Sequence, residues 1–449
     1  MWRDEAATWE AAHRTVPEIW HLLGRADVVH GLYYFFMHGV FAIFGDSLLT
    51  LRLPSVLAMT GAAALITRLA CQLAGKYTGV AAGLAFALLP AIQQYAQEGR
   101  PYALVTACVA LACRLLVAAV AGRGPGPGRW AAYSAVMLLA ALLNWFSLLV
   151  LFAHAVTIAL ARPPRATVLR WAVAACAAVL GALPLIVASR AQSGQVAWIP
   201  PVKPGTLVGL LATLVAGTLC AWLIRSGAVG RAHRGTRISL TTLALPLLAT
   251  PPLLLLAVSL SRPVYLDRYV LFGNLGLALL IGGACHALAV RIRTSPRRTI
   301  ATITALAFLG LLPVQLTLRS ASGRIDDVLA TAANVAAVRE QGDAVLYIPS
   351  ARRDTALVSP AEFAGLNDVA LVKDPLASGT LSGREGTPRQ IAKAMLTARR
   401  IVVVTDASAS SAATARDRTK QRILKAYFAR RSETSERGRK VVVYQRRPR

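Results

Sequence analysis

Residues Thr206–Ile224 read TLVGLLATLVAGTLCAWLI, a run without a charged side chain. An α-helix rises about 1.5 Å per residue, so roughly 20 apolar residues cross the roughly 30 Å of hydrocarbon in a bilayer. This stretch therefore predicts a transmembrane helix.

Similar apolar runs precede and follow it, and 55% of the 449 residues are hydrophobic while only 16% are charged. Lipid is the expected solvent for such a composition. The fold class predicted is an α-helical polytopic membrane protein with about ten spans. The expected spans are Leu53–Ala74, Thr78–Tyr95, Tyr102–Val120, Trp130–Leu143, Trp145–Ala161, Val168–Ser189, Thr206–Ile224, Ser239–Leu260, Tyr269–Val290 and Ile300–Leu318.

The charges are distributed unevenly over the loops between these runs. One set of alternate loops holds fourteen basic residues and no acid: Lys76, Arg123, Arg129, Arg162, Arg165, Arg170, Arg225, Arg231, Arg234, Arg237, Arg291, Arg293, Arg297 and Arg298. The other set holds Arg100, Arg190, Lys203, Arg262 and Arg268 with two acids. The positive-inside rule makes the first set cytoplasmic, and the net charge of +28 then marks topology rather than nucleic-acid binding.

This topology places both ends of the chain on the extracytoplasmic side and divides the chain into three parts. Residues 1–52 form an external first loop with an interfacial helix, 53–318 the membrane domain, and 319–449 a small exported α/β domain. In the last part three helix-then-strand patterns are expected: Asp326–Arg339 into AVLYIP, Arg389–Ala398 into RIVVVTD, and Thr419–Arg430 into KVVVYQ. Within this part a loop is expected from Ser378 to Thr387. No GxGxxG or GKS/GKT motif occurs there, so no nucleotide cofactor is expected.

The six cysteines all fall within or beside the expected spans. Neither a disulfide framework nor a zinc site is therefore predicted. The single histidines also lack the spacing of metal ligands, so no metal site is assigned.

Acidic residues are scarce, and their positions favour chemistry at one membrane surface. Between Asp46 and Asp326 the sequence contains only Glu98 and Asp267, both in the loops assigned to the outside. A proton-coupled transporter would be expected to hold such groups near the bilayer midplane. A carboxylate can accept a proton from a hydroxyl nucleophile, and a guanidinium can hold a phosphate. The N-terminal segment adds two adjacent acids, Asp4 and Glu5.

Several stretches in order resemble a known family. They are WRDEAATW, HGLYYFFMHGVFAIFGDSLLTLRLPS, YAQEGRPYAL, QVAWIPP and LDRYVLF. Together they resemble the polyprenyl-phosphate-sugar-dependent C-type glycosyltransferases, close to bacterial protein mannosyltransferase-like membrane enzymes of glycosyltransferase family 39. The resemblance extends from Trp2 to about Leu318.

The resemblance implies roles for individual residues. Asp4, with Glu5 beside it, matches the catalytic base of the family's first external loop. The donor phosphate would be bound by Arg100, Arg268 and Tyr269. The site would be lined by Glu98, Tyr102, His30, Gln192 and Trp198.

Two departures from the family pattern concern the N-terminus and one loop. An exported segment normally follows a span or signal, whereas Met1 is followed at once by the polar run WRDEAATWE, so we expect the family's first helix to be missing. Asn144 stands where the family pattern predicts a histidine.

Each site residue also has a structural interpretation. Asp4 and Glu5 suit the start of a helix, and Glu98 with Arg100 suits a local ion pair. Arg268 and Tyr269 suit an interfacial anchor, and His30 suits an amphipathic stretch at the interface. The loop that holds Gln192 and Trp198 suits a turn as well as a sugar contact.

The predicted function is an inverting glycosyltransferase that moves a sugar, with mannose expected and arabinose as the alternative, from a polyprenyl-phosphate carrier to an exported acceptor hydroxyl. The acceptor class (protein, lipid or glycan) stays open. No cofactor is required, although Asp4 and Glu5 leave a divalent cation as an open alternative. The rival function is a non-catalytic flippase or transporter of a lipid-linked sugar; a third, in which the α/β domain works and the spans only anchor it, is disfavoured by the number of spans.

Overall fold

The computed structural model describes residues 1–122, 127–192, 194, 199–226, 237–320, 323–408 and 414–448. These residues form two compact units. The helical unit comprises residues 52–316, and the terminal unit comprises residues 1–51 together with 317–449. The N-terminal segment and the α/β domain, which the sequence treats as separate parts, thus belong to one unit.

The helical unit confirms the predicted fold class, because every expected span is largely helical. Its helices are α4 (Leu48–Ala74), α5 (Lys76–Leu88), α6 (Pro90–Tyr95), α7 (Tyr102–Val120), α8 (Pro127–Leu143), η2 (Trp145–Leu148), α9 (Leu149–Ala161), α10 (Arg165–Ala191), α11 (Pro204–Arg225), α12 (Leu240–Ser259), η5 (Asp267–Val270), α13 (Gly273–Arg291) and α14 (Pro296–Arg319). Among the described residues, seven of these helices are long and apolar enough to cross a bilayer by themselves. The second expected span is divided between α5 and α6, because Pro90 opens a new helix and lacks the N–H that would continue the old one.

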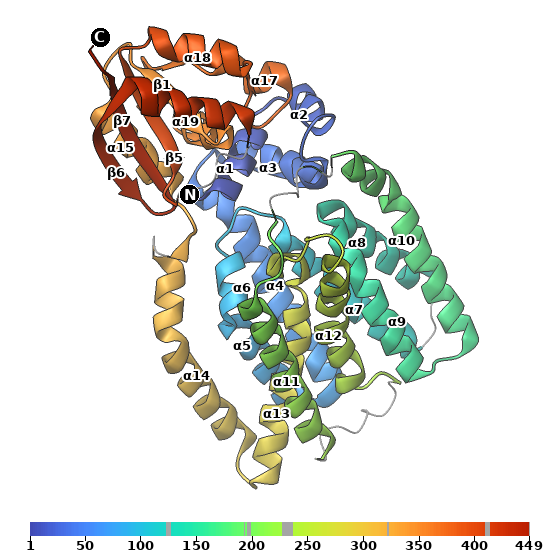
Figure 1. The fold of residues 1–449 in the computed structure, drawn as a ribbon. Coiled ribbons are helices and arrows are strands. Elements are labelled where there is room, and N and C mark those ends of the chain that lie inside the picture. Colours follow the sequence, from blue (N-terminus) through green and yellow to red (C-terminus); the bar gives the residue numbers. More distant parts are fainter. Residues whose placement is uncertain are drawn as a thin grey trace. The chain divides into compact units, whose positions relative to one another are not determined.

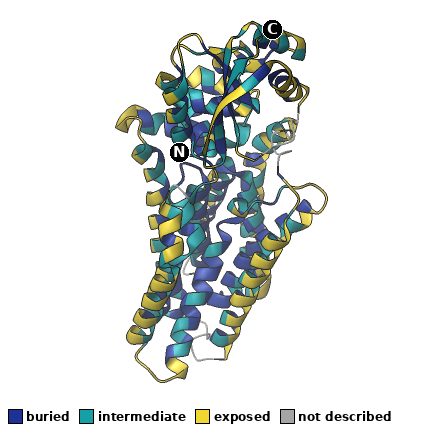
Figure 2. Cartoon of the chain, turned by 60° about the vertical axis from the view of Figure 1, so that its left-hand side comes forward, coloured by how far each residue is buried: buried dark blue, intermediate teal, exposed yellow. Residues whose placement is uncertain are grey.

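The outer helices expose apolar side chains, as lipid-facing helices do. In the most apolar 18-residue stretch of α14, only 11% is buried inside the protein, compared with 67% in the corresponding stretch of α13. Leu306 and Leu309 on α14 and Leu180 on α10 are more than half exposed. Figure 2 shows these outer helices largely yellow, around dark-blue inner ones. In water such a surface would be unstable, so the unit belongs in a membrane.

Small residues let the inner helices pack closely. A Cβ added at Gly282 of α13 would lie 2.5 Å from the backbone nitrogen of Ala82 on α5, and one at Gly276 would lie 2.4 Å from the carbonyl oxygen of Ala244 on α12. Because lipid provides no hydrophobic drive between helices, close van der Waals packing of this kind holds them together.

Polar side chains also join neighbouring helices inside the unit. The hydroxyl of Tyr133 on α8 lies 2.7 Å from Nδ1 of His154 on α9, and the Sγ of Cys113 on α7 lies 3.3 Å from its Nε2. The indole N–H of Trp171 on α10 donates to the Tyr133 hydroxyl at 3.3 Å. Four consecutive helices are thus linked through a fully buried histidine.

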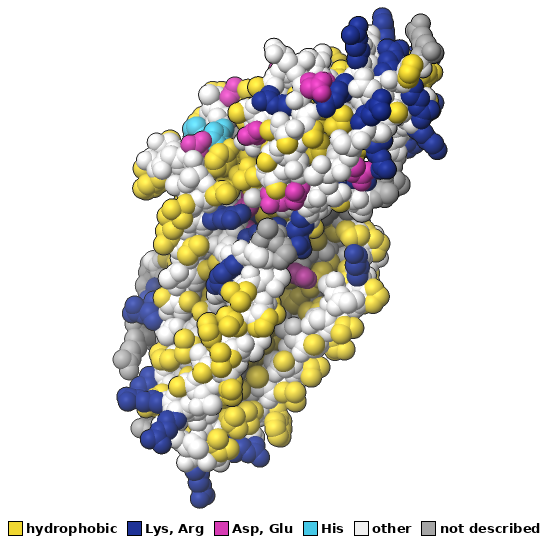
Figure 3. Space-filling view, turned by 90° about the vertical axis from the view of Figure 1, so that its left-hand side faces the viewer, with side chains coloured by type: hydrophobic (Ala, Val, Ile, Leu, Met, Phe, Trp, Pro, Cys, Tyr) yellow, Lys and Arg dark blue, Asp and Glu magenta, His cyan; other side chains and the backbone are white. Residues whose placement is uncertain are grey.

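The loops of the helical unit gather at two ends. At one end Arg237 donates to the carbonyl oxygen of Arg162 at 3.3 Å, which joins two of the arginine-rich loops. At the other end Tyr102 and Phe146, which follow different loops, both contact Tyr269. In Figure 3 dark-blue Lys and Arg side chains gather at the lower end of the helical unit, below its largely yellow length.

The terminal unit combines the N-terminal helices with the α/β domain. Its elements are α1 (Arg3–Ala12), α2 (Val16–Leu23), η1 (Val28–His30), α3 (Gly31–Phe44), α15 (Val328–Val338), β1 (Ala344–Ile348), η7 (Ser350–Arg353), α16 (Asp354–Val358), η8 (Pro360–Phe363), β2 (Asn367–Asp368), β3 (Leu371–Lys373), α17 (Pro375–Ser378), β4 (Arg384–Glu385), α18 (Pro388–Thr397), β5 (Arg400–Asp406), α19 (Ala415–Tyr427), β6 (Phe428–Glu436) and β7 (Arg439–Arg446).

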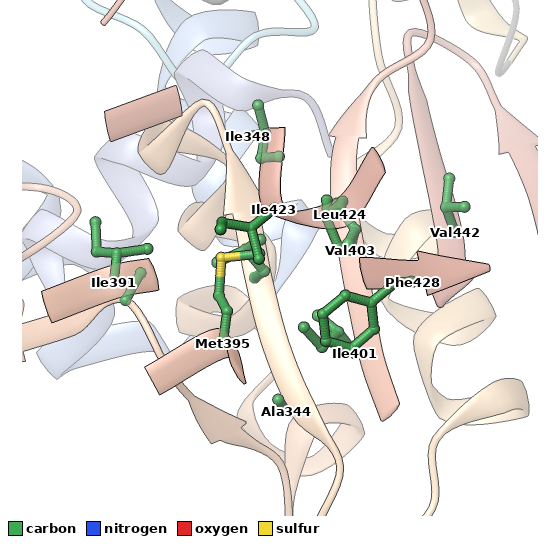
Figure 4. Close-up of a cluster of buried hydrophobic side chains, with 12 residues drawn as sticks. Ala344, Ile348, Ile391, Met395, Ile401, Val403, Ile423, Leu424, Phe428 and Val442 are labelled. Atoms are coloured by element: carbon green, nitrogen blue, oxygen red, sulfur yellow. The ribbon is translucent and has the colours of Figure 1, made fainter. Parts of the chain in front are cut away.

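Within the described residues the main sheet has the order β2-β1-β5-β7-β6, and β3 and β4 form a second, two-stranded sheet. Strand β1 pairs in parallel with β2 and β5, and β7 pairs antiparallel with β5 and β6. Side chains of β1 and β5 alternate between two apolar clusters, one with α18 and α19 and the other with α15. Figure 1 shows these helices about the sheet, and Figure 4 shows Met395 and Ile423 packed in the first cluster. Burial on both faces explains why these strands are continuously apolar.

Two short predictions in this domain were wrong. The third helix was expected to run to Arg430, but it ends at Tyr427 and β6 follows. Strand β6 is an edge strand whose sequence FARRSETSE is mostly polar and exposed, so its strand character depends on pairing with β7 rather than on an apolar pattern. The expected loop from Ser378 to Thr387 contains the short strand β4.

Candidate active site

The helical unit places Glu98, Arg100 and Tyr102 in and just after the turn between α6 and α7. All three are at least 95% buried. The hydroxyl of Ser55 on α4 donates to the carbonyl oxygen of Glu98 at 2.6 Å, and Pro101 occupies the N-cap of α7. The backbone of this turn is thereby held against α4.

The loop before α13 brings Arg268 and Tyr269 to the same place. The Cζ of Arg268 lies 5.7 Å from the centroid of the Tyr102 ring and 5.9 Å from that of Tyr269. Tyr102 and Arg268, 166 positions apart in the sequence, thus form one cluster with Tyr269, which the sequence predicted by resemblance alone.

A row of aromatic rings extends from this cluster. Ring centroids are 6.0 Å apart for Tyr95 and Tyr102, 6.2 Å for Tyr102 and Tyr269, 4.6 Å for Tyr269 and Phe146, and 4.2 Å for Phe146 and Trp145. The side chain of Asn144 accepts a hydrogen bond from the Phe146 N–H at 3.0 Å and shapes η2. Phe146 and Trp145 were not predicted as site residues, although Asn144 marks a short break between two apolar runs of the sequence.

Tyr265, which lies in the same loop as Arg268, is protonated at neutral pH. Burial, with a smaller contribution from the negative charge of Asp267, raises the pKa of Tyr265 to about 12. Its backbone N–H donates to the hydroxyl of Ser259 at 3.1 Å. The loop that presents Arg268 is therefore anchored to the end of α12.

The two remaining predicted site residues between residues 52 and 316 are Gln192 and Trp198, which follow α10 in the sequence. Gln192 is the C-cap of α10, where its N–H donates to the carbonyl oxygen of Ser189 at 3.1 Å. Trp198 lies outside the described residues.

Asp4, Glu5 and His30 belong to the terminal unit. Asp4 lies in the first turn of α1, with 16% of its side chain exposed and its Oδ1 3.8 Å from the Nε of Arg3. Glu5 is fully buried, and its carboxylate accepts the N–H of Trp2 at 3.3 Å. The Nδ1 of His30 lies 2.7 Å from Oδ1 of Asp27, and the hydroxyl of Tyr34 donates to Oδ2 of the same carboxylate.

These positions distinguish the two adjacent acids chemically. The Glu5 carboxylate supports the start of α1, as an acid at the third helical position commonly does. Asp4 is the acid that reaches solvent. Among the described residues, no group of three or more His, Cys, Asp or Glu side chains could hold a metal ion.

Comparison with known proteins gives a family match and a fold match. Residues 31–189 match the family model described as dolichyl-phosphate-mannose-protein mannosyltransferase. The apo crystal structure of ArnT from Cupriavidus metallidurans is similar to this chain with a TM-score of 0.59 and 11% identity, over 98% of this chain and 93% of that one. The chain has the C-type glycosyltransferase fold. The resemblance inferred from the motifs is thereby confirmed.

Two further solved structures are similar to this chain with lower TM-scores. ArnT from the same organism bound to undecaprenyl phosphate has a TM-score of 0.49 and 13% identity, over 92% of this chain and 87% of that one. The mycobacterial arabinofuranosyltransferase AftD has a TM-score of 0.49 and 14% identity, over 94% of this chain and 35% of its own length. None of the curated proteins matches the chain by sequence.

Proposed function

We propose that this C-type protein transfers a sugar, mannose in the first instance, from a polyprenyl-phosphate carrier to a hydroxyl of an exported acceptor. The observation that supports it best is the cluster of Arg268 with Tyr102, Tyr269 and the buried turn of Glu98 and Arg100. The family model that matches residues 31–189 describes mannosyl transfer from a lipid-phosphate sugar.

The cluster suits the phosphate end of a lipid-linked donor. A guanidinium is always charged and binds phosphate oxygens through short, charge-assisted hydrogen bonds. In a site shielded from water these bonds stabilise the negative charge that develops on the leaving phosphate. The proposal assigns this role to Arg268 and Arg100, with Tyr269 beside them, and places Glu98, Tyr102, Gln192, His30 and Trp198 around the sugar.

Proton transfer is assigned to the terminal unit. Asp4 takes the proton of the acceptor hydroxyl while the hydroxyl oxygen attacks the anomeric carbon. The bond from that carbon to the phosphate oxygen breaks, the electron pair stays with the polyprenyl phosphate, and attack from the opposite face inverts the anomeric centre. Glu5 acts as a positioning residue that holds the first turn of α1.

The proposed reaction uses no cofactor. A divalent ion shared by Asp4 and Glu5 is the weaker alternative, because the Glu5 carboxylate is buried and occupied by the Trp2 N–H. The assignment of the active site and the terminal unit to the extracytoplasmic side rests on the arginine-rich loops, which the positive-inside rule places in the cytoplasm.

The test uses membranes that contain the full-length protein and a polyprenyl-phosphate mannose carrying a radiolabel. Wild-type protein should move the label onto an acceptor, and Asp4→Asn should slow transfer by about 10²–10⁴-fold, the usual effect of losing a general base. The matched control is Glu340→Gln, because the Glu340 side chain is 72% exposed.

Full transfer by Asp4→Asn would refute the assigned base. Movement of labelled lipid between leaflets without any product would support the flippase instead, since transport needs no proton acceptor at Asp4.

A further inference from the structure

The terminal unit contains a cleft of about 620 Å³. It is lined on one side by Trp9, Glu10 and Arg14 of the N-terminal segment and on the other by Pro360 and Leu376 of the α/β domain. Clefts of roughly 300–1,000 Å³ are the size that small ligands occupy. The cleft shares no residue with the cluster around Arg268.

A buried ion pair with spare hydrogen-bonding capacity lines this cleft. Arg14 donates to Oε1 of Glu10 from Nε at 2.9 Å and from Nη2 at 2.5 Å, and Nη2 also donates to the carbonyl oxygen of Thr380 at 2.7 Å. The Arg14 side chain is only 1% exposed and that of Glu10 only 11%. Within the described residues, Nη1 of Arg14 and Oε2 of Glu10 have no hydrogen-bond partner.

Such groups are rare in native proteins, since a buried polar atom without a partner costs about 1–3 kcal/mol. Here Nε and Nη2 of Arg14 face Glu10, so Nη1 points away from that carboxylate. The carboxylate of Asp46, which is 59% exposed and lines the cleft, can accept a hydrogen bond from a ligand hydroxyl.

The rest of the lining suits the C–H face of a sugar ring. Trp9 provides an aromatic ring, and Pro360, Pro375 and Leu376 provide apolar surface. Aromatic rings of this kind combine apolar area with a polar edge.

Acidic side chains make the cleft unsuitable for anions. Glu18, Asp46 and Asp374 line it in addition to Glu10, and His13 contacts Asp46 at 2.9 Å. This local excess of carboxylates stands out in a chain with a net charge of +28. The lipid phosphate of the donor is therefore a poor ligand for this cleft.

We propose that the cleft binds an uncharged sugar ring of the acceptor, which makes the acceptor a glycan or a glycosylated molecule. The proposal rests on the proposed transferase function and specifies its acceptor. Helix α1 carries both the proposed base and one wall of the cleft, so Asp4 and Glu10 are separated by about 9 Å along the helix axis. A bound ring would thus lie within the span of a short glycan from the base.

The experiment measures binding of mannotriose to the purified full-length protein in nanodiscs by isothermal titration calorimetry, without any donor. Leu376→Trp should fill the cleft and weaken binding by about tenfold or more, since a lost contact of 1.4 kcal/mol already gives tenfold. Leu376 is 45% exposed, so the larger side chain need not disturb the core. Leu376→Arg is a second blocking variant.

The matched control is Val372→Trp, which adds the same bulk at a position 68% exposed in the same domain but outside the cleft. It should bind mannotriose as the wild type does. The melting temperature of each variant verifies that it is folded.

Three results would overturn the proposal: no mannotriose binding by the wild type, binding by both Leu376 variants as strong as that of the wild type, or binding of trilysine in place of mannotriose. Trilysine binding that Leu376→Trp abolishes would identify a site for basic peptides. Because the titration needs no donor, its result is separate from that of the transfer assay.

Discussion

At the scale of single residues, neighbouring side chains of the same type have different environments. Asp4 and Glu5 are adjacent in sequence, yet one is partly exposed and the other is buried and caps a helix. Helix periodicity separates them by about 100°, so they cannot share one environment. This difference is why the proposed base is Asp4.

Glu10 provides a residue-scale prediction about pH. Burial raises the pKa of Glu10 above its ordinary value of 4.5, although the positive charge of Arg14 acts in the opposite direction. The folded state therefore holds the Glu10 proton more strongly than the unfolded state does. This contribution to stability is full below pH 4.5 and is lost as the pH rises through the folded-state pKa.

Glu10→Gln removes that titration. The melting temperature of the wild type, relative to that of Glu10→Gln, should therefore rise when the pH is lowered from neutral toward 4.5. Scanning fluorimetry of both proteins in the same detergent at several pH values measures it. A melting-temperature difference that stays constant across this pH range would show that burial does not raise the pKa of Glu10.

At the scale of elements, α13 depends on glycine at its contacts with neighbouring helices. The space at Gly282 is closed by the backbone of Ala82, which cannot move without shifting α5. At Gly310 of α14, by contrast, nothing lies within 4 Å of an added Cβ. The two positions thus allow the same substitution to be compared in tight and open surroundings.

Gly282→Ala should destabilise the helical unit by about 1–3 kcal/mol, as overpacking does. Gly310→Ala should be neutral or stabilising by up to about 1 kcal/mol, because alanine favours helix over glycine. Thermal unfolding in detergent distinguishes them. Equal melting temperatures for the two variants would contradict the close approach of α13 and α5.

At the scale of the whole molecule, the two ends of the chain are joined in one unit by Asp326. Its Oδ1 accepts the N–H of Arg3 at 3.0 Å, and its Oδ2 accepts from the fully buried Arg439 at 2.9 Å. Arg439 also donates to Asp354 at 2.5 Å. These carboxylates raise the pKa of Arg439, so its charge is permanent.

Asp326→Ala should destabilise the terminal unit strongly, by about 3–5 kcal/mol, because it leaves the buried charge of Arg439 with one carboxylate fewer. It should also release the start of α1, so limited proteolysis should cut within residues 1–51 sooner. Glu340→Gln is the control, since an exposed ion pair contributes at most about 1 kcal/mol. Unchanged proteolysis of Asp326→Ala would refute this link.

The sequence by itself determined the spans of the membrane domain and three strands of the α/β domain, β1, β5 and β7. Both depend on local patterns: a run of about 20 apolar residues spans a bilayer wherever it occurs, and a strand buried on both faces is continuously apolar. The motif order also predicted the C-type fold. The assignment of Arg100, Tyr102, Arg268 and Tyr269 to the site follows from the resemblance and stays a prediction. Strands β2, β3, β4 and β6 were not predicted, because strands of two or three residues and an exposed edge strand have no apolar pattern.

The tertiary structure alone decided which residues meet. Asp326 contacts Arg3, 323 positions away, and Arg439, 113 positions away. The row of rings from Tyr95 to Trp145 and the cleft between Trp9 and Leu376 likewise combine distant segments. Such contacts follow from how helices and strands pack in three dimensions, and no local pattern of residues encodes them.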